Sequence, residues 1–332
     1  MARHVLIAPD KLRGTATAAE AAGAIAEPFR AAGWTADCCP LSDGGEGFLA
    51  ALGGGNRIST VTDPLGAPVE VRWRLVGGMA ILETAPVSAP VLAARPTAAQ
   101  AEKASSYGVG QLLAAAMTAG AGEVLLGLGG SAFSDGGRGA LAALEAAGLL
   151  PLPAALRVAV DVQTGYLDAA RVFGPQKGAD AAAVVRLSAG LAGTAEQLSR
   201  RWGRDPAGVP GTGAAGGLAG LLWALGGRLE SGFTVVADRL GLAERIAAAE
   251  LVVTAEGRLD ATSLAGKVVG GLLDRAGGRS VWILAGAVAP DLPRLPDTVR
   301  LTDLSATFGA SRARDDVLGC LARAVRAGLA AA

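Results

Sequence analysis

Residues 251–260 read LVVTAEGRLD, an apolar run that passes directly into charged residues. The first part, Leu251–Thr254, predicts a buried strand, and Val268–Arg275 further on predicts a helix. Charged side chains fall in the turn between them, namely Glu256, Arg258, Asp260 and Lys267. Ligands of open α/β sheets bind at the carboxyl ends of the strands. The stretch therefore predicts an α/β sheet with a site for anions, and perhaps a metal, at this edge.

Both ends of the chain alternate strand and helix signals. Expected strands are 5–8, 36–40, 281–285 and 299–301, and expected helices are 17–32, 46–52, 264–275 and 315–329. A strand–helix–strand pattern of this kind favours a parallel sheet with helices on both faces. We therefore expect the two chain ends to build one domain.

The middle of the chain has a different pattern. Short apolar runs at 59–61, 69–75 and 79–83 are separated by turn signals, a spacing typical of antiparallel hairpins. Helix 106–119, strand 123–128 and helices 139–147 and 184–198 are expected after them. We therefore predict an α/β fold with a discontinuous parallel-sheet domain, residues 1–58 plus 241–332. A second, mixed α/β domain, residues 59–240, is expected to be inserted in it.

The composition argues against several classes of function. The 332 residues carry 30 Lys plus Arg and 30 Asp plus Glu, and this net charge of zero does not favour nucleic acid or an anionic membrane as partner. No apolar run is long enough for a membrane span, and no signal peptide is recognisable. The three cysteines form no CxxC pair, which favours a reducing cytoplasm over structural zinc. The only histidine, His4, precedes the first strand, so a Ser-His-Asp hydrolase is not expected.

Four further segments place glycines beside one or two charges. They are residues 8–15 (APDKLRGT), 41–47 (LSDGGEG), 127–137 (GLGGSAFSDGG) and 173–178 (FGPQKG). Glycines let backbone N–H groups approach phosphate oxygens, and the start of a following helix adds positive potential. Phosphoryl transfer needs such donors, a metal and a carboxylate beside the attacking hydroxyl. The segments supply these types of group.

In this combination the chain resembles the type I glycerate kinases. The resemblance covers nearly the whole chain and rests on seven motifs in the family's order, which add SYGVG at 106–110, GAAGG at 213–217 and EGRLD at 256–260 with Gly266-Lys267 to the four segments above. It implies ATP-dependent phosphorylation of D-glycerate, with 2-phosphoglycerate favoured as product and Mg²⁺ bridging the nucleotide phosphates. It also implies a flavodoxin-like first domain and an active site in the cleft between the two domains. Whether the protein forms a homo-oligomer is left open by the resemblance.

The resemblance also suggests site residues. The catalytic candidates are Asp43, Asp135, Arg258 and Asp260. Asp135 or Asp260 would deprotonate the acceptor hydroxyl, Arg258 would bind the substrate carboxylate, and Asp43 and Asp135 are the candidate Mg²⁺ ligands. Candidates for binding substrate or nucleotide are Asp10, Lys11, Gly44, Gly129, Gly130, Ser131, Lys177, Glu256 and Lys267.

Each of these residues also has a plain structural interpretation. Asp43 and Glu46 have the spacing of a helix capping box. Arg258 and Asp260 could form an ion pair across the turn, and Lys177 could be a solvated loop lysine. These alternatives remain open at the level of sequence.

Two apparent nucleotide motifs are rejected. Residues 211–216 match GxGxxG, but the residues before them predict a loop and not the strand that a dinucleotide fingerprint requires. Residues 261–268 are not a P-loop, because Ala261 replaces its first glycine and Val268 its Ser/Thr. A nucleotide redox protein and a Walker-type kinase are therefore not expected.

Three places in the chain depart from the family's pattern. Arg13 stands where lysine is more common, Thr164 lies in DVQTG where the family has Asp-Val-x-Asn-Pro, and Thr262-Ser263 replaces a common Gln-Thr. The departures at Thr164 and at Thr262-Ser263 bear on the substrate side more than on the phosphate side. Two alternatives therefore stay open: a kinase for another small hydroxy acid, and a non-catalytic ligand-binding paralogue.

Overall fold

The sheet that contains β9 (Leu251–Leu259) is assembled from both ends of the chain. In the computed structural model, which describes residues 3–331, its strand order is β11-β10-β9-β1-β2 and every neighbouring pair is parallel. Its other strands are β1 (His4–Ile7), β2 (Thr35–Cys38), β10 (Val281–Val288) and β11 (Val299–Asp303). The parallel sheet expected from the chain ends is thus confirmed.

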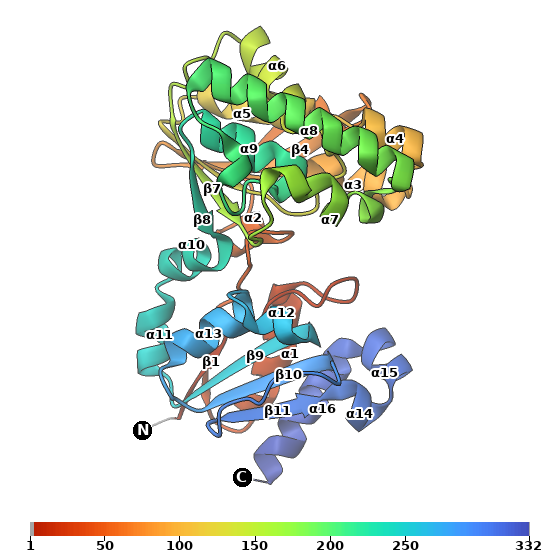
Figure 1. Cartoon of the computed structure of the whole chain (residues 1–332). Helices are drawn as coiled ribbons and strands as arrows, with labels where there is room; N and C mark the ends of the chain where they lie inside the picture. Colours follow the sequence, from red (N-terminus) through yellow and green to blue (C-terminus); the bar gives the residue numbers. More distant parts are fainter. Residues whose placement is uncertain (1–2, 332) are drawn as a thin grey trace. The chain divides into compact units, whose positions relative to one another are not determined.

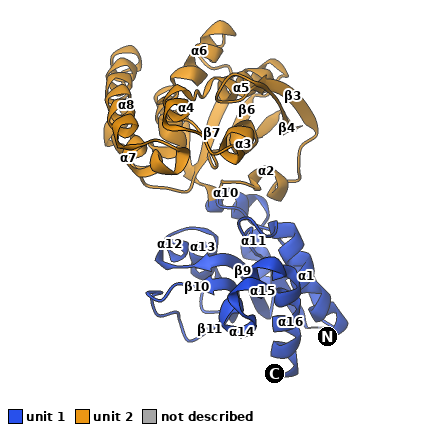
Figure 2. Cartoon of the chain, turned by 90° about the vertical axis from the view of Figure 1, so that its right-hand side faces the viewer, with its two compact units in different colours: residues 1–43, 233–332 blue, residues 44–232 orange. Residues whose placement is uncertain are grey.

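The chain divides into two units (Figure 2). Unit 1 contains residues 1–43 and 233–332, and unit 2 contains residues 44–232. The first unit is therefore discontinuous, and the second is an insertion within it.

Helices lie on both faces of the unit 1 sheet (Figure 1). On one face, α1 (Ala18–Ala31) and α16 (Val317–Ala330) share a buried cluster with Val253 and Leu284 of the sheet. On the other, α11 (Leu242–Ala248) contacts β1 and α13 (Val268–Ala276) contacts β9. The remaining helices of this unit are α10 (Gly232–Arg239), α12 (Ala261–Leu264), α14 (Leu304–Phe308) and α15 (Ala310–Asp315).

Helix α1 follows from local sequence. Thr17 caps its N-terminus in a capping box with Glu20, in which Thr17 N–H donates to Glu20 Oε2 at 2.9 Å and Glu20 N–H donates to Thr17 Oγ1 at 3.2 Å. Apolar residues at helical spacing, including Ile25 and Phe29, are fully buried. The predicted helix 17–32 is confirmed on this basis.

Strand β9 is longer than expected. The prediction that the strand ends at Thr254 and that Glu256 and Arg258 lie in a turn is wrong. Pairing with β10 continues to the end of β9, with Glu256 opposite Ala285 and Arg258 opposite Ala287. A Cβ on Gly286 would lie 2.5 Å from the Gly257 carbonyl oxygen, so glycine at 286 allows the two strands to approach here.

The helix expected over 264–275 is two shorter helices. Helix α12 ends at Leu264 and α13 begins at Val268. Gly266 between them has φ +82°, a left-handed conformation that interrupts the helical path. Lys267 therefore stands at the N-cap of α13 and not inside a helix.

Unit 2 is built on a six-stranded mixed sheet in the order β3-β4-β5-β6-β7-β8. The strands are β3 (Arg57–Thr62), β4 (Pro68–Val76), β5 (Met79–Glu83), β6 (Glu123–Gly127), β7 (Ala155–Val160) and β8 (Arg228–Ser231). The pairs β3–β4 and β4–β5 are antiparallel, as their short spacing predicted, and β5 to β8 are parallel. The mixed α/β character of the insertion is thus confirmed.

The helices of unit 2 bury one continuous core against this sheet, including Trp73, Leu126 and Tyr166. They are α2 (Phe48–Ala51), α3 (Ala85–Ala93), α4 (Ala98–Lys103), α5 (Tyr107–Thr118), α6 (Arg138–Ala146), α7 (Ala169–Phe173), α8 (Ala181–Trp202) and α9 (Leu218–Ala224). Within residues 3–331, no helix combines the length and the apolar character that a membrane crossing requires.

Candidate active site

The carboxyl ends of three neighbouring strands in unit 1 bring charged residues together. Asp10 follows β1, and its N–H donates to the Ala255 carbonyl of β9 at 3.1 Å. Asp43 follows β2 a few residues further on. The Lys11 ammonium lies 3.6 Å from Asp10 Oδ1 and 3.4 Å from Asp43 Oδ1. Asp10, Lys11, Asp43 and Glu256 of β9 are called the edge cluster below.

The edge cluster has more negative than positive charge in a buried setting. Burial and, to a smaller extent, the neighbouring Asp43 raise the pKa of Asp10 to about 6, against the opposing effect of Lys11. Burial and the charge of Asp10 raise the pKa of Glu256 to about 7. Burial opposes the charge of Lys11, but the two aspartates raise the pKa of Lys11 above its ordinary value. Such perturbed carboxylates at a ligand-binding edge are typical of a functional site.

Arg258 and Asp260 do not form the ion pair that their spacing allowed. The Arg258 side chain is exposed, and no ion pair holds it in the described part of the chain. Asp260 is the N-cap of α12 and accepts from Thr262 N–H at 2.8 Å and Ser263 N–H at 3.1 Å. The Thr262 hydroxyl also donates to it, and this bond contributes most to a lowered pKa of Asp260. Lys267 lies close enough to contribute to the same lowering.

The glycine-rich segment after β6 is held by Lys177. The ammonium of Lys177 donates to Ser131 Oγ at 3.0 Å and to the Phe133 carbonyl at 2.6 Å. Lys177 is only 4% exposed, so it is not a solvated loop lysine. Burial lowers the pKa of Lys177 to about 7. Its position fits a residue that fixes the segment carrying Gly129, Gly130 and Ser131.

Asp135 joins the starts of two helices. Its Oδ2 accepts from the Ser106 N–H and hydroxyl, both at 2.9 Å, and from the Gly139 N–H at 3.0 Å. Its Oδ1 accepts from the Gly137 N–H at 3.0 Å. The carboxylate therefore ties α5 to α6 and has little capacity left for a substrate proton or a metal.

Two structural residues at this end of unit 2 were missed by the sequence analysis. Glu83, at the end of β5, accepts from the Gly47 N–H at 3.0 Å and the Leu49 N–H at 3.1 Å at the start of α2. The N-cap of α2 is Gly47, which makes no side-chain cap bond, so the capping box suggested for Asp43 and Glu46 is not formed. The only available signal for Glu83 was a carboxylate at the end of an apolar strand. Ser106 lay within a quoted motif, but its bond to Asp135 depends on a residue 29 positions away.

Gly44 and the GxGxxG segment serve close packing. A Cβ on Gly44, which has φ +98°, would lie 3.1 Å from Gly232 Cα. A Cβ on Gly216 would lie 2.2 Å from the Phe133 carbonyl oxygen, and the Gly216 carbonyl accepts from the Gly136 N–H at 3.0 Å. Residues 211–216 therefore support the Asp135 segment, and the element directly before them is the short 3₁₀ helix Pro206–Gly208 and not a strand.

The oxygen donors of the edge cluster fit Mg²⁺ better than Asp135 does. Among residues 3–331, no three His, Cys, Asp or Glu side chains gather closely enough to hold a metal by themselves. Mg²⁺ is commonly bound by one or two carboxylates together with substrate phosphates and water. Asp10 and Asp43 can supply such carboxylates, whereas the Asp135 oxygens are engaged by backbone and serine donors.

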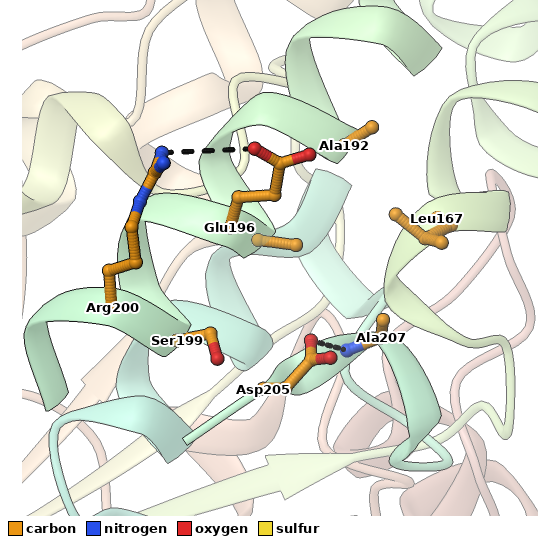
Figure 3. Close-up of a pocket in the computed structure, with 8 residues that line it drawn as sticks. Leu167, Ala192, Glu196, Ser199, Arg200, Asp205 and Ala207 are labelled. Atoms are coloured by element: carbon orange, nitrogen blue, oxygen red, sulfur yellow. Dashed lines mark hydrogen bonds and ion pairs between the residues drawn. The ribbon is translucent and has the colours of Figure 1, made fainter. Parts of the chain in front are cut away.

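A separate groove of about 430 Å³ lies beside α8 in unit 2 (Figure 3). Its side chains include Arg200, which pairs with Glu196 at 3.8 Å, and Asp205, which accepts from the Ala207 N–H at 2.9 Å. None of the site residues expected from the sequence lines it. The groove therefore offers no support for the expected chemistry.

Comparison with known proteins decides the family. The family model described as "Glycerate kinase family" matches residues 5–150 and 152–326. The chain belongs to the glycerate kinase family. This confirms the resemblance seen in the motifs and makes the protein an enzyme of the kinase class.

Individual glycerate kinases match over most of the chain. The Glycerate 2-kinase of Escherichia coli (strain K12) is 37% identical over 308 residues, which cover 80% of this chain and 79% of that protein. The Glycerate kinase of Bacillus subtilis (strain 168) is 32% identical over 332 residues and 86% of each chain. A crystal structure described as "putative glycerate kinase 2" from Salmonella typhimurium LT2 matches with a TM-score of 0.76 and 30% identity, covering 100% of this chain and 99% of that one. The two-unit α/β architecture of this glycerate kinase family member is thus shared with a solved relative.

Proposed function

We propose that the protein transfers the γ-phosphoryl group of ATP to a hydroxyl of D-glycerate, with 2-phosphoglycerate as product. The observation that carries the proposal is the edge cluster at the carboxyl ends of β9, β1 and β2, found in a chain of the glycerate kinase family. The position of the phosphoryl group is suggested by the E. coli relative, which is named a Glycerate 2-kinase.

The residues divide into groups that suit this reaction. The exposed Arg258 guanidinium is available to bind the glycerate carboxylate in a bidentate manner. Lys267 and the backbone N–H groups of Gly129, Gly130 and Ser131 are suited to phosphate oxygens. Lys177 serves the reaction indirectly, by holding Ser131 and Phe133.

We propose Mg²⁺ as the metal, with Asp43 as a ligand and Asp10 as the second carboxylate. When bound, the metal neutralises charge on the phosphate oxygens. Lys11 lies between the same two carboxylates and keeps them in place. Asp135 is proposed as a positioning residue instead of the ligand and base suggested by the motif.

The test is ADP release by purified protein with MgATP and D-glycerate. L-glycerate and a panel of small hydroxy acids form the comparison, and reactions without Mg²⁺ test the metal. The product is identified by ³¹P NMR, because a phosphate on the secondary carbon couples to one proton and a phosphate on the primary carbon couples to two. Turnover on D-glycerate with a doublet signal supports the proposal.

Other outcomes of this experiment would favour a different function. ADP release only with a different acid would favour a kinase for that acid, a view motivated by Thr164 and Thr262. No turnover by a folded protein that still binds ATP would favour a ligand-binding paralogue.

We also propose a cytoplasmic location, since Cys38, Cys39 and Cys320 are all free thiols. Recovery of the protein from a secreted fraction would contradict this location.

A further inference from the structure

Thr84 is a buried threonine whose hydroxyl does not cap the helix that it precedes. It follows β5 directly and stands at the N-cap of α3, where a threonine side chain commonly accepts a backbone N–H of the helix. Here the side chain makes no cap bond. Its hydroxyl instead donates to the Gly129 carbonyl at 2.7 Å and, at the longer distance of 3.2 Å, to the Gly127 carbonyl. The side chain is therefore directed at the glycine-rich segment after β6.

The Gly129 carbonyl depends on this hydroxyl more than the Gly127 carbonyl does. The Gly127 carbonyl also accepts from the Thr84 backbone N–H at 3.1 Å. For the Gly129 carbonyl, the Thr84 hydroxyl is the one donor found within residues 3–331. Removal of the hydroxyl would therefore leave Gly127 with a partner and the Gly129 carbonyl without one.

The bond fixes the orientation of the peptide group between Gly129 and Gly130. In a trans peptide the C=O and the N–H point in opposite directions. Because the Gly129 carbonyl points to the hydroxyl of the fully buried Thr84, the Gly130 N–H points away from it. Gly130 is exposed, and its N–H has no acceptor among the described residues. A donor is thus held free for a molecule that approaches this segment.

The glycines on both sides of this peptide make its orientation easy to lose. Glycine adopts left-handed and right-handed backbone conformations at similar cost, and Gly130 has φ +61°. A peptide between two glycines can therefore turn over unless a hydrogen bond holds it. On the other side of Gly130, the Ala132 N–H donates to the hydroxyl of the fully buried Ser88 at 3.1 Å. The segment is thus anchored before and after its exposed glycine.

We propose that Thr84 is a positioning residue for ATP, which holds the Gly129–Gly130 peptide so that the Gly130 N–H donates to a phosphate oxygen of the nucleotide. The inference rests on the proposed function, in which backbone N–H groups of this segment bind phosphate oxygens. Thr84 itself does not touch the nucleotide. A phosphate oxygen is a charged acceptor, and hydrogen bonds to charged groups are stronger than those between neutral groups. The orientation of this N–H therefore affects the affinity for the nucleotide.

The experiment measures the Kd for MgATP by isothermal titration calorimetry without acceptor, and the KM for ATP and for D-glycerate by ADP release. T84V keeps the shape of the side chain and removes the hydroxyl, whereas T84S keeps the hydroxyl. T84V is expected to raise both the Kd and the KM for ATP about 10-fold and to leave the KM for D-glycerate unchanged. T84S is expected to stay within about 2-fold of wild type, because its hydroxyl can still donate to Gly129.

Thr194 provides a matched control. It is a buried threonine of α8 whose hydroxyl donates to the Gly190 carbonyl at 2.8 Å. T194V removes the same type of bond and is expected to leave both KM values unchanged. T84C is a second variant in case T84V does not fold. Its thiol is a weak donor, so T84C is expected to weaken ATP binding where T84S does not. Thermal unfolding confirms that each variant is folded.

The outcomes distinguish the inference from the proposed function. Wild-type ATP affinity in T84V and T84C, or an equal loss in T84S or T194V, overturns the inference alone. An equal rise of both KM values in T84V also overturns it, because a general loosening of the fold would then explain the effect. Turnover of another acid but not D-glycerate overturns the proposed substrate, and the MgATP titrations still test Thr84. A folded wild type that binds no ATP overturns both.

Discussion

At the scale of single residues, carboxylates with similar sequence settings have different tasks. Asp135 and Asp260 each stand in a motif of glycines and charges, but their oxygens accept backbone N–H groups. Glu256 accepts from a single backbone N–H, that of Gly257, in the described chain. The difference follows from the partners that the fold brings to each carboxylate.

Asp135→Asn is expected to destabilise the protein. The amide can accept at only one of its two termini, so even with its oxygen at the Oδ2 place the buried Gly137 N–H loses its acceptor and faces an NH₂ group, and the remaining donors lose a charged partner. We expect a loss of about 2 kcal/mol or more in the free energy of unfolding, measured by urea titration. The exposed Asp168→Asn serves as control, with an expected change below about 0.5 kcal/mol. Lost activity at an unchanged unfolding midpoint would instead assign Asp135 to the chemistry.

Lys177 is expected to make stability depend on pH. Burial lowers its pKa from 10.5 to about 7, so between these values the unfolded chain binds more protons than the folded chain. The free energy of unfolding therefore rises with pH in this window, by up to about 1.4 kcal/mol per pH unit.

Urea titrations at pH 7, 8 and 9 check this expectation. The stability of wild type relative to Lys177→Met should increase with pH. Lys103→Met changes an exposed lysine and should give no such trend. If the difference in the free energy of unfolding between wild type and Lys177→Met stayed flat or fell with pH, burial would not lower the pKa of Lys177.

At the scale of elements, helix starts and helix contacts account for several motif residues. Asp260 caps α12, Glu83 binds the start of α2, and Asp135 joins α5 to α6. Glycines allow elements to approach where a side chain would intrude.

Asp260→Asn and Asp260→Ala separate capping from catalysis. Asparagine is as good an N-cap as aspartate, whereas alanine costs about 1 kcal/mol. If Asp260 acts only as a cap, the asparagine variant keeps most of the activity and stability and the alanine variant loses stability. Loss of turnover in both variants, measured as ADP release, would show that the carboxylate charge itself is required.

Gly110→Ala is expected to separate α5 from α6. The added Cβ would lie 2.5 Å from the Ala140 carbonyl oxygen and 2.7 Å from its Cα, too close for any rotamer change to relieve. We expect the free energy of unfolding to fall by about 1–3 kcal/mol. Gly193→Ala in the exposed middle of α8 meets nothing within 4 Å and should stabilise by about 0.5–1 kcal/mol. Equal effects of the two changes in urea titrations would argue against the close contact.

At the scale of the whole molecule, each unit has its own sheet and its own buried cluster. The buried residues of the unit 2 cluster lie within 61–224, and the buried residues of the unit 1 cluster join 5–29 to 253–325. Cooperative folding of each unit follows from such a division.

Residues 44–232 are expected to fold when expressed alone. The fragment retains the whole six-stranded sheet and a core that includes Trp73 and Tyr166. A sigmoidal urea transition with near-ultraviolet circular dichroism signal is the expected result. The fragment 1–43 is the control and should be unfolded, because β1 there lacks its β9 neighbour. A fragment 44–232 without a cooperative transition would show that its core depends on unit 1.

The sequence by itself predicted the α/β class, the parallel sheet of the chain ends, the antiparallel hairpins of the insertion and the family. These depend on local features: apolar periodicity, turn residues, and glycines and charges at short spacing. Helix α1 is one example, because its cap and its buried face are both encoded within fifteen adjacent residues.

Only the tertiary structure decided which charged side chains are engaged in hydrogen bonds and ion pairs. The length of β9 depends on its pairing with β10. Lys177 is buried because it packs against the 127–137 segment, and Asp135 is engaged because the fold brings Ser106 to it. The edge cluster gathers residues from positions 10, 43 and 256, whose proximity depends on strand order. Partners far apart in sequence leave no local pattern, and burial and pKa depend on those partners, so the roles of the carboxylates became visible only in the fold.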